Sequence, residues 1–240
     1  MRLTNVSFRY RRRDPSVIRQ IDAALVPGDV VELAGANGAG KSTLLRLLAD
    51  LLRPTGGAIT GRPAAVGLAP DRFPTEQPFT VSGYLDHMRR VCGAGRWEPW
   101  AERLNLSPLL GVRLRELSKG SAHKVGLVQA LMAEPGLLLL DEPFAGLDPG
   151  TRAELPPVVA ELSARGAVVV VADHQGELRG LPSLRRWVLT DGRLSETAPP
   201  VTGEGVTVEV TVPADALGAF LERMRGEGYP ARPVSLEESR

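Results

Sequence analysis

The feature that most constrains this fold is a glycine-rich stretch, Gly35–Thr43 (GANGAGKST), between two apolar segments. Val30–Ala34 (VVELA) precedes it as a run of strand length, and leucines follow it at helical spacing from position 44 to position 52. The stretch matches the pattern G-x-x-x-x-G-K-[ST], whose backbone N–H groups cradle phosphates. A helix that begins directly after the loop adds positive potential there. The sequence therefore predicts a site that binds the phosphates of a nucleotide.

Individual residues of this loop have separate predicted roles. Lys41 is expected to reach the β- and γ-phosphate oxygens, and the Ser42 hydroxyl is expected to ligate Mg²⁺. A chance glycine turn would match the pattern on the order of once per hundred chains of this length, and the flanking strand and helix make chance rarer still. The residues predicted to contact the nucleotide here are Gly35, Asn37, Gly38, Ala39, Gly40, Lys41, Ser42 and Thr43.

Composition narrows the class of protein. A chain of 240 residues is long enough for one large domain with or without a small appendage. The net charge of +1 lacks the basic excess that is usual in nucleic-acid-binding proteins, so no nucleic-acid partner is expected. With Cys92 as the only cysteine, neither an intrachain disulfide nor a cysteine-based metal site is expected, which fits a reducing compartment. The longest apolar runs have strand length, far below the roughly 20 residues of a membrane span. We therefore expect a cytoplasmic chain that does not itself cross a membrane.

The order of apolar segments predicts an α/β fold. Leu137–Leu140 and Val168–Val171 are continuous apolar runs, which is typical of parallel strands covered on both faces. Pro149–Arg165 between them supplies a crossover helix. Leu3–Tyr10 and Ile21–Val26 alternate like half-buried strands. A mostly parallel central sheet with an N-terminal antiparallel β layer is therefore expected.

Two further parts complete the predicted domain organisation. Residues 72–135 are expected to form a helical insertion, with helices around Tyr84–Val91 and Trp97–Leu104. A boundary at Pro199–Pro200 separates the main domain, residues 1–198, from a small α+β appendage, residues 199–240. In the appendage, alternating valines from Val206 to Val212 predict a strand, and apolar residues on one face predict a helix before a last strand. About forty residues bury little core, so this part is expected to dock on the main domain or on a partner.

Two acidic residues follow the apolar strand Leu137–Leu140. Asp141 stands at its carboxyl end, where open parallel sheets place ligand-binding groups, and is predicted to hold Mg²⁺. Glu142 is predicted to orient or deprotonate the water that attacks the γ-phosphate. By itself such a pair could be an ordinary cap. The phosphate loop upstream favours the catalytic interpretation.

The segment Leu117–Ser121 (LSKGS) resembles the signature sequence of ATP-binding cassette proteins. It places Ser118 and the backbone of Gly120 at the start of a helix predicted over Lys119–Ala133, which forms a second anion-binding helix terminus. Gly146–Pro149 (GLDP) resembles the loop that links the two ATP sites in that family, and His174 resembles the switch histidine. The resemblance covers about residues 1–195 and implies a P-loop NTPase fold.

The resemblance also implies roles for these residues. Ser118 and Gly120 would cover the γ-phosphate held by a second subunit, with Asp148 in the loop between the two ATP sites. His174 would hydrogen-bond the γ-phosphate and hold the catalytic geometry together with Glu142. Tyr10 resembles the aromatic residue that stacks on adenine, although Tyr10 or its neighbour Phe8 could equally be a packing residue of the β layer. The implied catalytic residues are Lys41, Glu142 and His174.

One position departs from the family pattern. Val66–Pro70 resembles the strand that leads to a glutamine, which contacts Mg²⁺ and the transport partner, but the next residue here is Asp71. A carboxylate also binds Mg²⁺, so Asp71 joins Ser42 and Asp141 as a predicted metal ligand. The acidic residue and the Ser-Lys-Gly form of the signature resemble the drug, lipid and polymer export branch more than nutrient importers.

The resemblance implies an ATPase subunit of a membrane transporter. It would act as a homodimer or heterodimer that sandwiches two ATP molecules, peripheral on the inner face of the cell membrane. A separate transmembrane permease subunit would dock on Phe73–Val91. The alternative is a soluble ATP-driven switch that acts on ribosomes or DNA. Relatives of that kind typically carry two cassettes in one chain, or long coiled-coil or zinc insertions, and this sequence shows neither. A third interpretation is a nucleotide kinase outside this family, but the matches of Ser118–Ser121 and His174 to the family motifs would then be coincidences. The cargo depends on chains other than this one.

Overall fold

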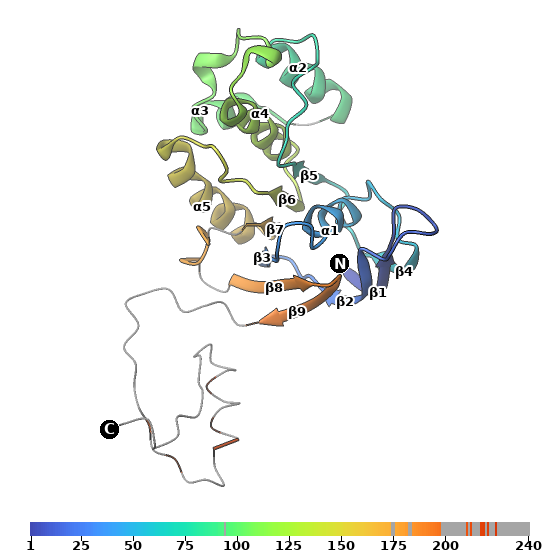
Figure 1. Cartoon of the computed structure of the whole chain (residues 1–240). Helices are drawn as coiled ribbons and strands as arrows, with labels where there is room; N and C mark the ends of the chain where they lie inside the picture. Colours follow the sequence, from blue (N-terminus) through green and yellow to red (C-terminus); the bar gives the residue numbers. More distant parts are fainter. Residues whose placement is uncertain are drawn as a thin grey trace, which may run out of the picture.

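The computed structural model describes residues 1–93, 95–173, 176–181 and 184–197, and six further positions at 210, 212, 217, 218, 220 and 224. Within these ranges the chain forms two β-sheets with helices around them (Figure 1). The predicted appendage, residues 199–240, lies almost wholly outside the described residues, as does His174. Its strand and helix therefore stay predictions.

The larger sheet of the described chain carries the candidate site. Its six strands, in spatial order, are β5 (Val66–Ala69), β6 (Leu137–Asp141), β7 (Val168–Ala172), β3 (Val30–Ala34), β8 (Leu184–Thr190) and β9 (Arg193–Thr197). The first five run parallel, and β9 returns antiparallel to β8. The sheet is therefore mostly parallel, as predicted, and its parallel strands end at one common edge.

Alternate residues of the central strands pack into two different cores. In β6, Leu138 and Leu140 belong to the core beneath the helices, whereas Leu137 and Leu139 belong to the core on the opposite face. The valines of β7 divide between the two cores in the same way. Burial on both faces explains why these strands read as continuous apolar runs.

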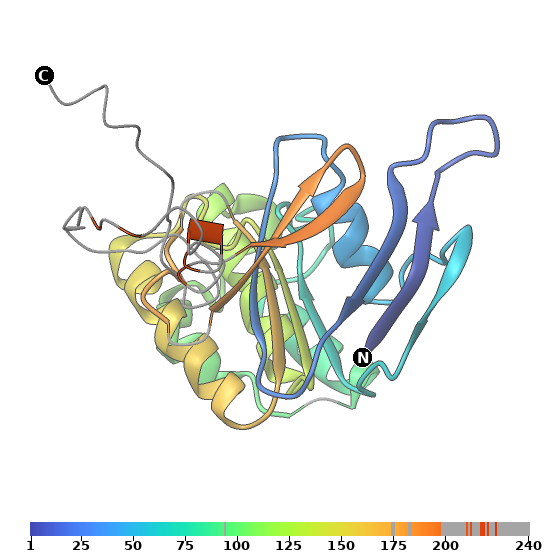
Figure 2. The same ribbon diagram turned by 90° about the horizontal axis from the view of Figure 1, so that it is seen from below.

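A three-stranded antiparallel sheet covers the second core. Its order is β2 (Ile18–Ala24), β1 (Arg2–Phe8) and β4 (Gly56–Thr60). Helix α1 (Lys41–Leu48) lies between this sheet and the larger one (Figure 2), and its buried leucines belong to the shared core. The predicted N-terminal antiparallel layer is therefore present.

The strand bounds in this layer differ from the prediction. β2 starts three residues earlier than expected, at Ile18. It also ends two residues earlier, at Ala24, because Val26 belongs to a turn in which its N–H donates to the Asp29 carboxylate at 2.8 Å. β1 ends at Phe8 rather than Tyr10. β4 was not predicted, because its two leading glycines hide it from an apolar pattern. Gly57 has φ 75°, and a Cβ there would lie 2.2 Å from the Asn5 carbonyl oxygen, so glycine is required.

The helices between β5 and β6 gather at one end of the molecule (Figure 1). They are α2 (Val81–Cys92), α3 (Glu98–Arg103) and α4 (Lys119–Met132), with short 3₁₀ turns at Ser107–Leu109 and Leu114–Glu116. Helix α2 starts earlier than expected because the Thr80 hydroxyl accepts a hydrogen bond from the Gly83 N–H and caps it. Its end is set by Gly93, which has φ 59°.

Helix α5 (Pro149–Ala164) crosses from β6 to β7 and contains two prolines in its interior, Pro156 and Pro157. A proline cannot donate the helical hydrogen bond to the residue four positions earlier. Pro156 is half-buried and Pro157 is exposed, so these prolines avoid the face that packs on the sheet. That buried face consists of Leu155, Val158, Val159 and Leu162.

Candidate nucleotide-binding site

The loop between β3 and α1 has a backbone that only glycine fits. Gly35, Gly38 and Gly40 have φ values of 154°, 81° and 107°. A Cβ on Gly35 would lie 2.6 Å from the Leu189 carbonyl oxygen of β8. Gly40 forms the N-cap of α1 and has no capping side chain, so the first N–H groups of the helix face the loop. The conformation is that of an anion-binding helix terminus.

Lys41 connects this loop to the acidic end of β6. Its side chain is largely buried, and Nζ donates to the Gly35 carbonyl oxygen at 2.7 Å. The same Nζ lies 3.8 Å from Oε1 of Glu142. The lysine is therefore positioned between the phosphate loop and the carboxylate predicted to activate water.

Asp141 ends β6 as a buried carboxylate beside Ser42. Burial raises the pKa of Asp141, and the negative charge of Asp71 adds to this rise, whereas a hydrogen bond from the Ser42 hydroxyl opposes it. Carboxylate and hydroxyl oxygens are the ligands that Mg²⁺ prefers. Ser42 and Asp141 therefore fit the predicted metal position, with Asp71 close enough to act on it electrostatically.

Asp71 faces the signature segment from the loop after β5. It is half-buried, and its Oδ1 lies 3.5 Å from Nζ of Lys119. It also acts on His123 in α4, where burial lowers the pKa of the imidazole and the charge of Asp71 opposes that shift. Asp71 therefore lies between the predicted metal position and the start of α4.

Glu142 has a backbone conformation that is unusual for its residue type. Its φ is 51°, in the left-handed region, and its N–H donates to the Ala172 carbonyl oxygen of β7 at 2.8 Å. Such a conformation costs of order 1–3 kcal/mol in a residue other than glycine and is concentrated at functional sites. The strained turn places the Glu142 side chain beside Lys41.

The structure separates the two aromatic rings near the N-terminus. Phe8 is buried in the core under the small sheet, whereas Tyr10 is 53% exposed and lies edge-on to Phe8 with ring centroids 5.0 Å apart. The Tyr10 hydroxyl hydrogen-bonds the Thr43 hydroxyl at 2.9 Å. Phe8 is thus the packing residue, and Tyr10 presents an exposed ring beside the phosphate loop.

The signature segment forms the N-terminus of α4. Ser118 caps the helix, with its Oγ accepting from the Ser121 N–H at 3.2 Å. Gly120 touches the loop after β6 so closely that a Cβ would lie 2.1 Å from the Gly146 carbonyl oxygen. Two segments assigned to separate motifs are thus in direct backbone contact.

Asp148 is held within its own chain. It caps α5 by accepting from the Thr151 N–H at 3.0 Å, and it pairs with the buried Lys124 of α4. The Lys124 ammonium and these hydrogen bonds hold the pKa of Asp148 well below its usual range. Asp148 therefore fixes α5 to α4 in addition to any contact with a nucleotide.

The comparison with protein families shows which family the chain belongs to. A family model described as ABC transporter matches residues 18–145, which is more than half of the chain. The chain belongs to the ABC transporter family. The matched range contains the phosphate loop, the signature segment and the acidic pair of this cassette.

Curated relatives include both exporters and importers. The cytochrome c biogenesis ATP-binding export protein CcmA of Novosphingobium aromaticivorans is 38% identical over 165 residues, covering 69% of this chain and 84% of that protein. The zinc import ATP-binding protein ZnuC of Psychrobacter arcticus is 34% identical over 209 residues, covering 82% and 85%. The probable multidrug ABC transporter ATP-binding protein YbhF of Escherichia coli is 34% identical over 185 residues. That match covers 70% of this chain but only 32% of YbhF.

Solved structures confirm the predicted α/β P-loop fold. An ATP-binding subunit of an ABC transporter matches with a TM-score of 0.73 at 26% identity, covering 81% of this chain and 88% of that chain. A nucleotide-free ATP-binding cassette matches with a TM-score of 0.65 at 22% identity, covering 82% and 90%, which shows the fold alone.

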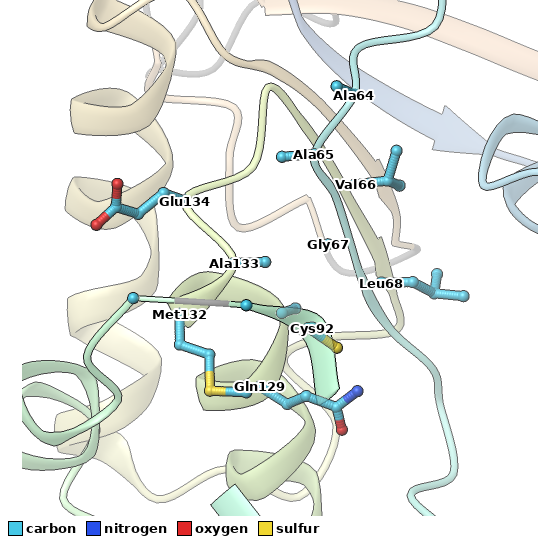
Figure 3. Close-up of a pocket in the computed structure, with 13 residues that line it drawn as sticks. Ala64, Ala65, Val66, Gly67, Leu68, Cys92, Gln129, Met132, Ala133 and Glu134 are labelled. Carbon is cyan, nitrogen blue, oxygen red and sulfur yellow. The ribbon is translucent and has the colours of Figure 1, made fainter. Parts of the chain in front are cut away.

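A cavity of about 510 Å³ lies elsewhere in the cassette (Figure 3). It is lined by the start of β5, the end of α2 and the end of α4, with Cys92, Gln129 and Glu134 among its side chains. None of the residues assigned to the nucleotide lines it.

Among the described helices, none is long and apolar enough to cross a bilayer.

The sequence reasoning missed two groups of buried charges in this cassette. Lys124, the partner of Asp148, lies 24 positions upstream of it, and no spacing rule joins them. Glu32 lies 2% exposed in β3, facing Arg186 and Arg179. The signal for Glu32 was visible in the sequence, because it is the only charged residue in the run Val30–Ala34.

Proposed function

We propose that this chain is the ATP-hydrolysing subunit of an ABC transporter and drives transport through a separate transmembrane subunit. The observation that carries the proposal is the position of Lys41, with Nζ 2.7 Å from the Gly35 carbonyl oxygen and 3.8 Å from the Glu142 carboxylate. One ammonium group thus joins the phosphate grip to the residue suited to activate water.

Each residue has a defined part in the proposed reaction. The α1 N-terminus and Lys41 bind the phosphates and offset negative charge as the γ-phosphoryl group leaves. Glu142 orients the attacking water and accepts its proton. Ser42 and Asp141, with Asp71, would hold Mg²⁺, which would neutralise charge on the β- and γ-phosphates. Tyr10 stacks on the adenine ring, and His174 contacts the γ-phosphate.

A second cassette, in a homodimer or heterodimer, completes the proposed site. Ser118 and the Gly120 backbone lie at a helix N-terminus, a place suited to an anion. Within the chain, Gly120 contacts the Gly146 loop instead of the phosphate loop. We therefore propose that the signature segment of each subunit covers the ATP of the other, with Asp148 near the junction.

The proposed partner is a permease at the inner face of the membrane, docked on the surface around α2. Phe79 is half-buried and stacks on His87 with ring centroids 5.3 Å apart, which leaves part of its ring open to a partner. Tyr84 is buried and donates to Gln129, so it supports this surface from below. Phe79→Asp is expected to abolish co-purification with the permease, and because Phe79 also packs against the core and the Tyr84 ring, its thermal midpoint should fall as well. Retained co-purification of the folded variant would contradict this docking site.

For the direction of transport we propose export. Support comes from Asp71 with Lys119 in the Ser-Lys-Gly signature, and from the 38% identity to a protein named as an exporter. The ZnuC relative is named as an importer, so the direction needs its own measurement. Cargo accumulation inside inverted membrane vesicles that hold this chain and its permease would support export.

The test of the proposed function compares two variants. Glu142→Gln keeps the side-chain volume but removes the base, so ATP binding should persist while turnover falls by at least about a hundredfold. Lys41→Ala should instead abolish nucleotide binding. Turnover and binding are measured separately, by phosphate release and by a fluorescent ATP analogue. An unchanged ATPase rate in Glu142→Gln would overturn the proposal.

A further inference from the structure

The buried carboxylate of Glu32 requires an explanation that the phosphate site does not supply. Glu32 occupies the middle of β3, is 2% exposed, and pairs in register with Val171 of β7 and Arg186 of β8. Burying an ionised carboxylate costs several kcal/mol, and apolar replacement of a buried ion pair is often neutral or stabilising. Stability alone therefore does not account for a glutamate here.

One partner of Glu32 lies within the sheet. Nε of Arg186 is 3.2 Å from Oε2 of Glu32, across the β3–β8 register. Burial raises the pKa of Glu32, whereas the charges of Arg186 and Arg179 oppose that rise. Neither Nε of Arg186 nor Oε2 of Glu32 makes a hydrogen bond within the described part of the chain, so the contact is an ion pair that holds the Glu32 carboxylate beside β8.

The other partner, Arg179, comes from the segment after β7. Its Nε lies 3.9 Å from Oε1 of Glu32. Its guanidinium also lies against Gly176, where a Cβ would meet Nε at 2.3 Å and Cζ at 2.4 Å. The backbone closes the same turn, because the Arg179 N–H donates to the Gly176 carbonyl oxygen at 3.2 Å. Arg179 therefore connects Glu32 directly to the backbone at Gly176.

Asp173 connects the other end of this segment. It follows β7, is 2% exposed, and its Oδ2 accepts from the Gly176 N–H at 2.8 Å. Its negative charge repels that of Glu32 and raises the pKa of Glu32, so Asp173 joins the cluster through Gly176 and Arg179. Asp173 and Gly176 are the described residues on either side of His174 and Gln175. Both flanks of His174 are thus tied to one charge cluster, made of Glu32, Asp173, Arg179 and Arg186.

We propose that Glu32 is a positioning residue for ATP hydrolysis, which acts through Arg179 to fix both flanks of His174 relative to β3. Glu32 lies three residues before Gly35, on the strand that leads into the phosphate loop. The cluster thus gives the segment around His174 and the phosphate loop a common support. This inference rests on the proposed function, because it assigns a part in that reaction.

The experiment compares Glu32→Gln and Arg179→Gln with a matched control, Asp29→Asn. Asp29 pairs with Arg185 and so also joins the β3 and β8 segments, but it lies at the other end of β3 from the cluster. Turnover is measured by phosphate release, and hydrogen exchange is measured at the amides of Gly176 and Arg179. Small misplacements near the chemistry cost up to about a hundredfold in rate, so we expect kcat to fall about tenfold or more in both cluster variants.

Several outcomes separate positioning from a purely structural part. Positioning predicts a KM for ATP within about twofold of the parent, faster exchange at Gly176 and Arg179, and a double variant no worse than either single one. Asp29→Asn should change neither kcat nor this exchange. If Glu32→Gln lowers only the thermal midpoint, as Asp29→Asn does, the inference is wrong. If Glu32→Gln fails to fold, Arg179→Gln decides, since its side chain is more exposed.

The test also distinguishes this inference from the proposed function. Hydrogen exchange at Gly176 and Arg179 needs no catalytic activity. Unchanged exchange in Arg179→Gln would contradict the link even if ATP is hydrolysed. If the parent protein shows no ATPase activity but Arg179→Gln still speeds exchange at Gly176 and Arg179, the link is supported and the proposed function is contradicted.

Discussion

Replacing Gly120 by alanine tests whether the signature segment and the loop after β6 move as one unit. A Cβ at this position would lie 2.1 Å from the Gly146 carbonyl oxygen, and ordinary contact begins at 3.4 Å. The two backbones must therefore separate by roughly an ångström, and overpacking of this kind costs about 1–3 kcal/mol. Alanine is a better helix former than glycine by up to about 1 kcal/mol, which offsets part of that cost in α4.

We expect a net destabilisation of about 1–2 kcal/mol in Gly120→Ala, from overpacking offset by helix propensity. For a chain of this length the thermal midpoint then falls by about 2–8 °C. ATPase activity should fall more than stability implies, because the shifted loop continues from Glu142. Calorimetry and phosphate release measure the two effects.

Gly126→Ala is the matched control in the same helix. Its nearest neighbour outside the helix is a side-chain atom, Cδ2 of Phe73, at 3.3 Å from the added Cβ. A ring can shift slightly where a backbone cannot, so this control should be nearly neutral in both stability and activity. Equal effects of the two substitutions, or an unchanged thermal midpoint in Gly120→Ala, would refute the reasoning.

Two further predictions concern residues around the site. Asp148→Asn keeps an N-cap side chain but removes the charge that pairs with Lys124. Because the folded-state pKa of Asp148 is depressed, its contribution is present above the unfolded pKa and is lost as pH falls below about 4. The variant should therefore lose about 1 kcal/mol or less of unfolding free energy at neutral pH, since Asp148 is partly exposed. Its urea-unfolding midpoint should also depend less on pH between about 5 and 3 than that of the parent protein. An unaltered pH dependence would contradict the pairing with Lys124. Tyr10→Ala should weaken ATP binding about fivefold or more through loss of stacking, whereas Tyr10→Phe, which removes only the hydroxyl bonded to Thr43, should change ATP affinity little; equal losses in both variants would exclude stacking as the cause.

The sequence predicted those parts of the fold that depend on neighbouring residues. The apolar runs of β6 and β7 were recognised because both faces of these strands are buried. The phosphate loop was recognised because its glycines adopt backbone angles that other residues avoid. β4 was missed because it is held by backbone pairing with β1 and has few apolar side chains.

The unpredicted contacts of the site depend on tertiary structure. Phe8 packs in the core and Tyr10 does not, because β1 ends at Phe8. The residue types at positions 8 and 10 do not predict where the strand ends. The contact of Gly120 with Gly146 joins the start of α4 to the loop that follows β6 in the chain. The partners of Glu32 lie more than 140 positions away: Arg186 meets it through the parallel register of β3 and β8, and Arg179 reaches it from the segment after β7. Such pairings require the completed sheet.

The two prolines of α5 bear on how the chain folds as it leaves the ribosome. Without two of its helical hydrogen bonds, a helix of 16 residues has little stability of its own. Its apolar face packs into the same core as β7, which follows it in the chain. The core around the apolar face of α5 is therefore complete only when Val169 and Val171 of β7 have joined it. An uncovered apolar helix face promotes aggregation, so slow docking of β7 should lower the yield of folded cassette.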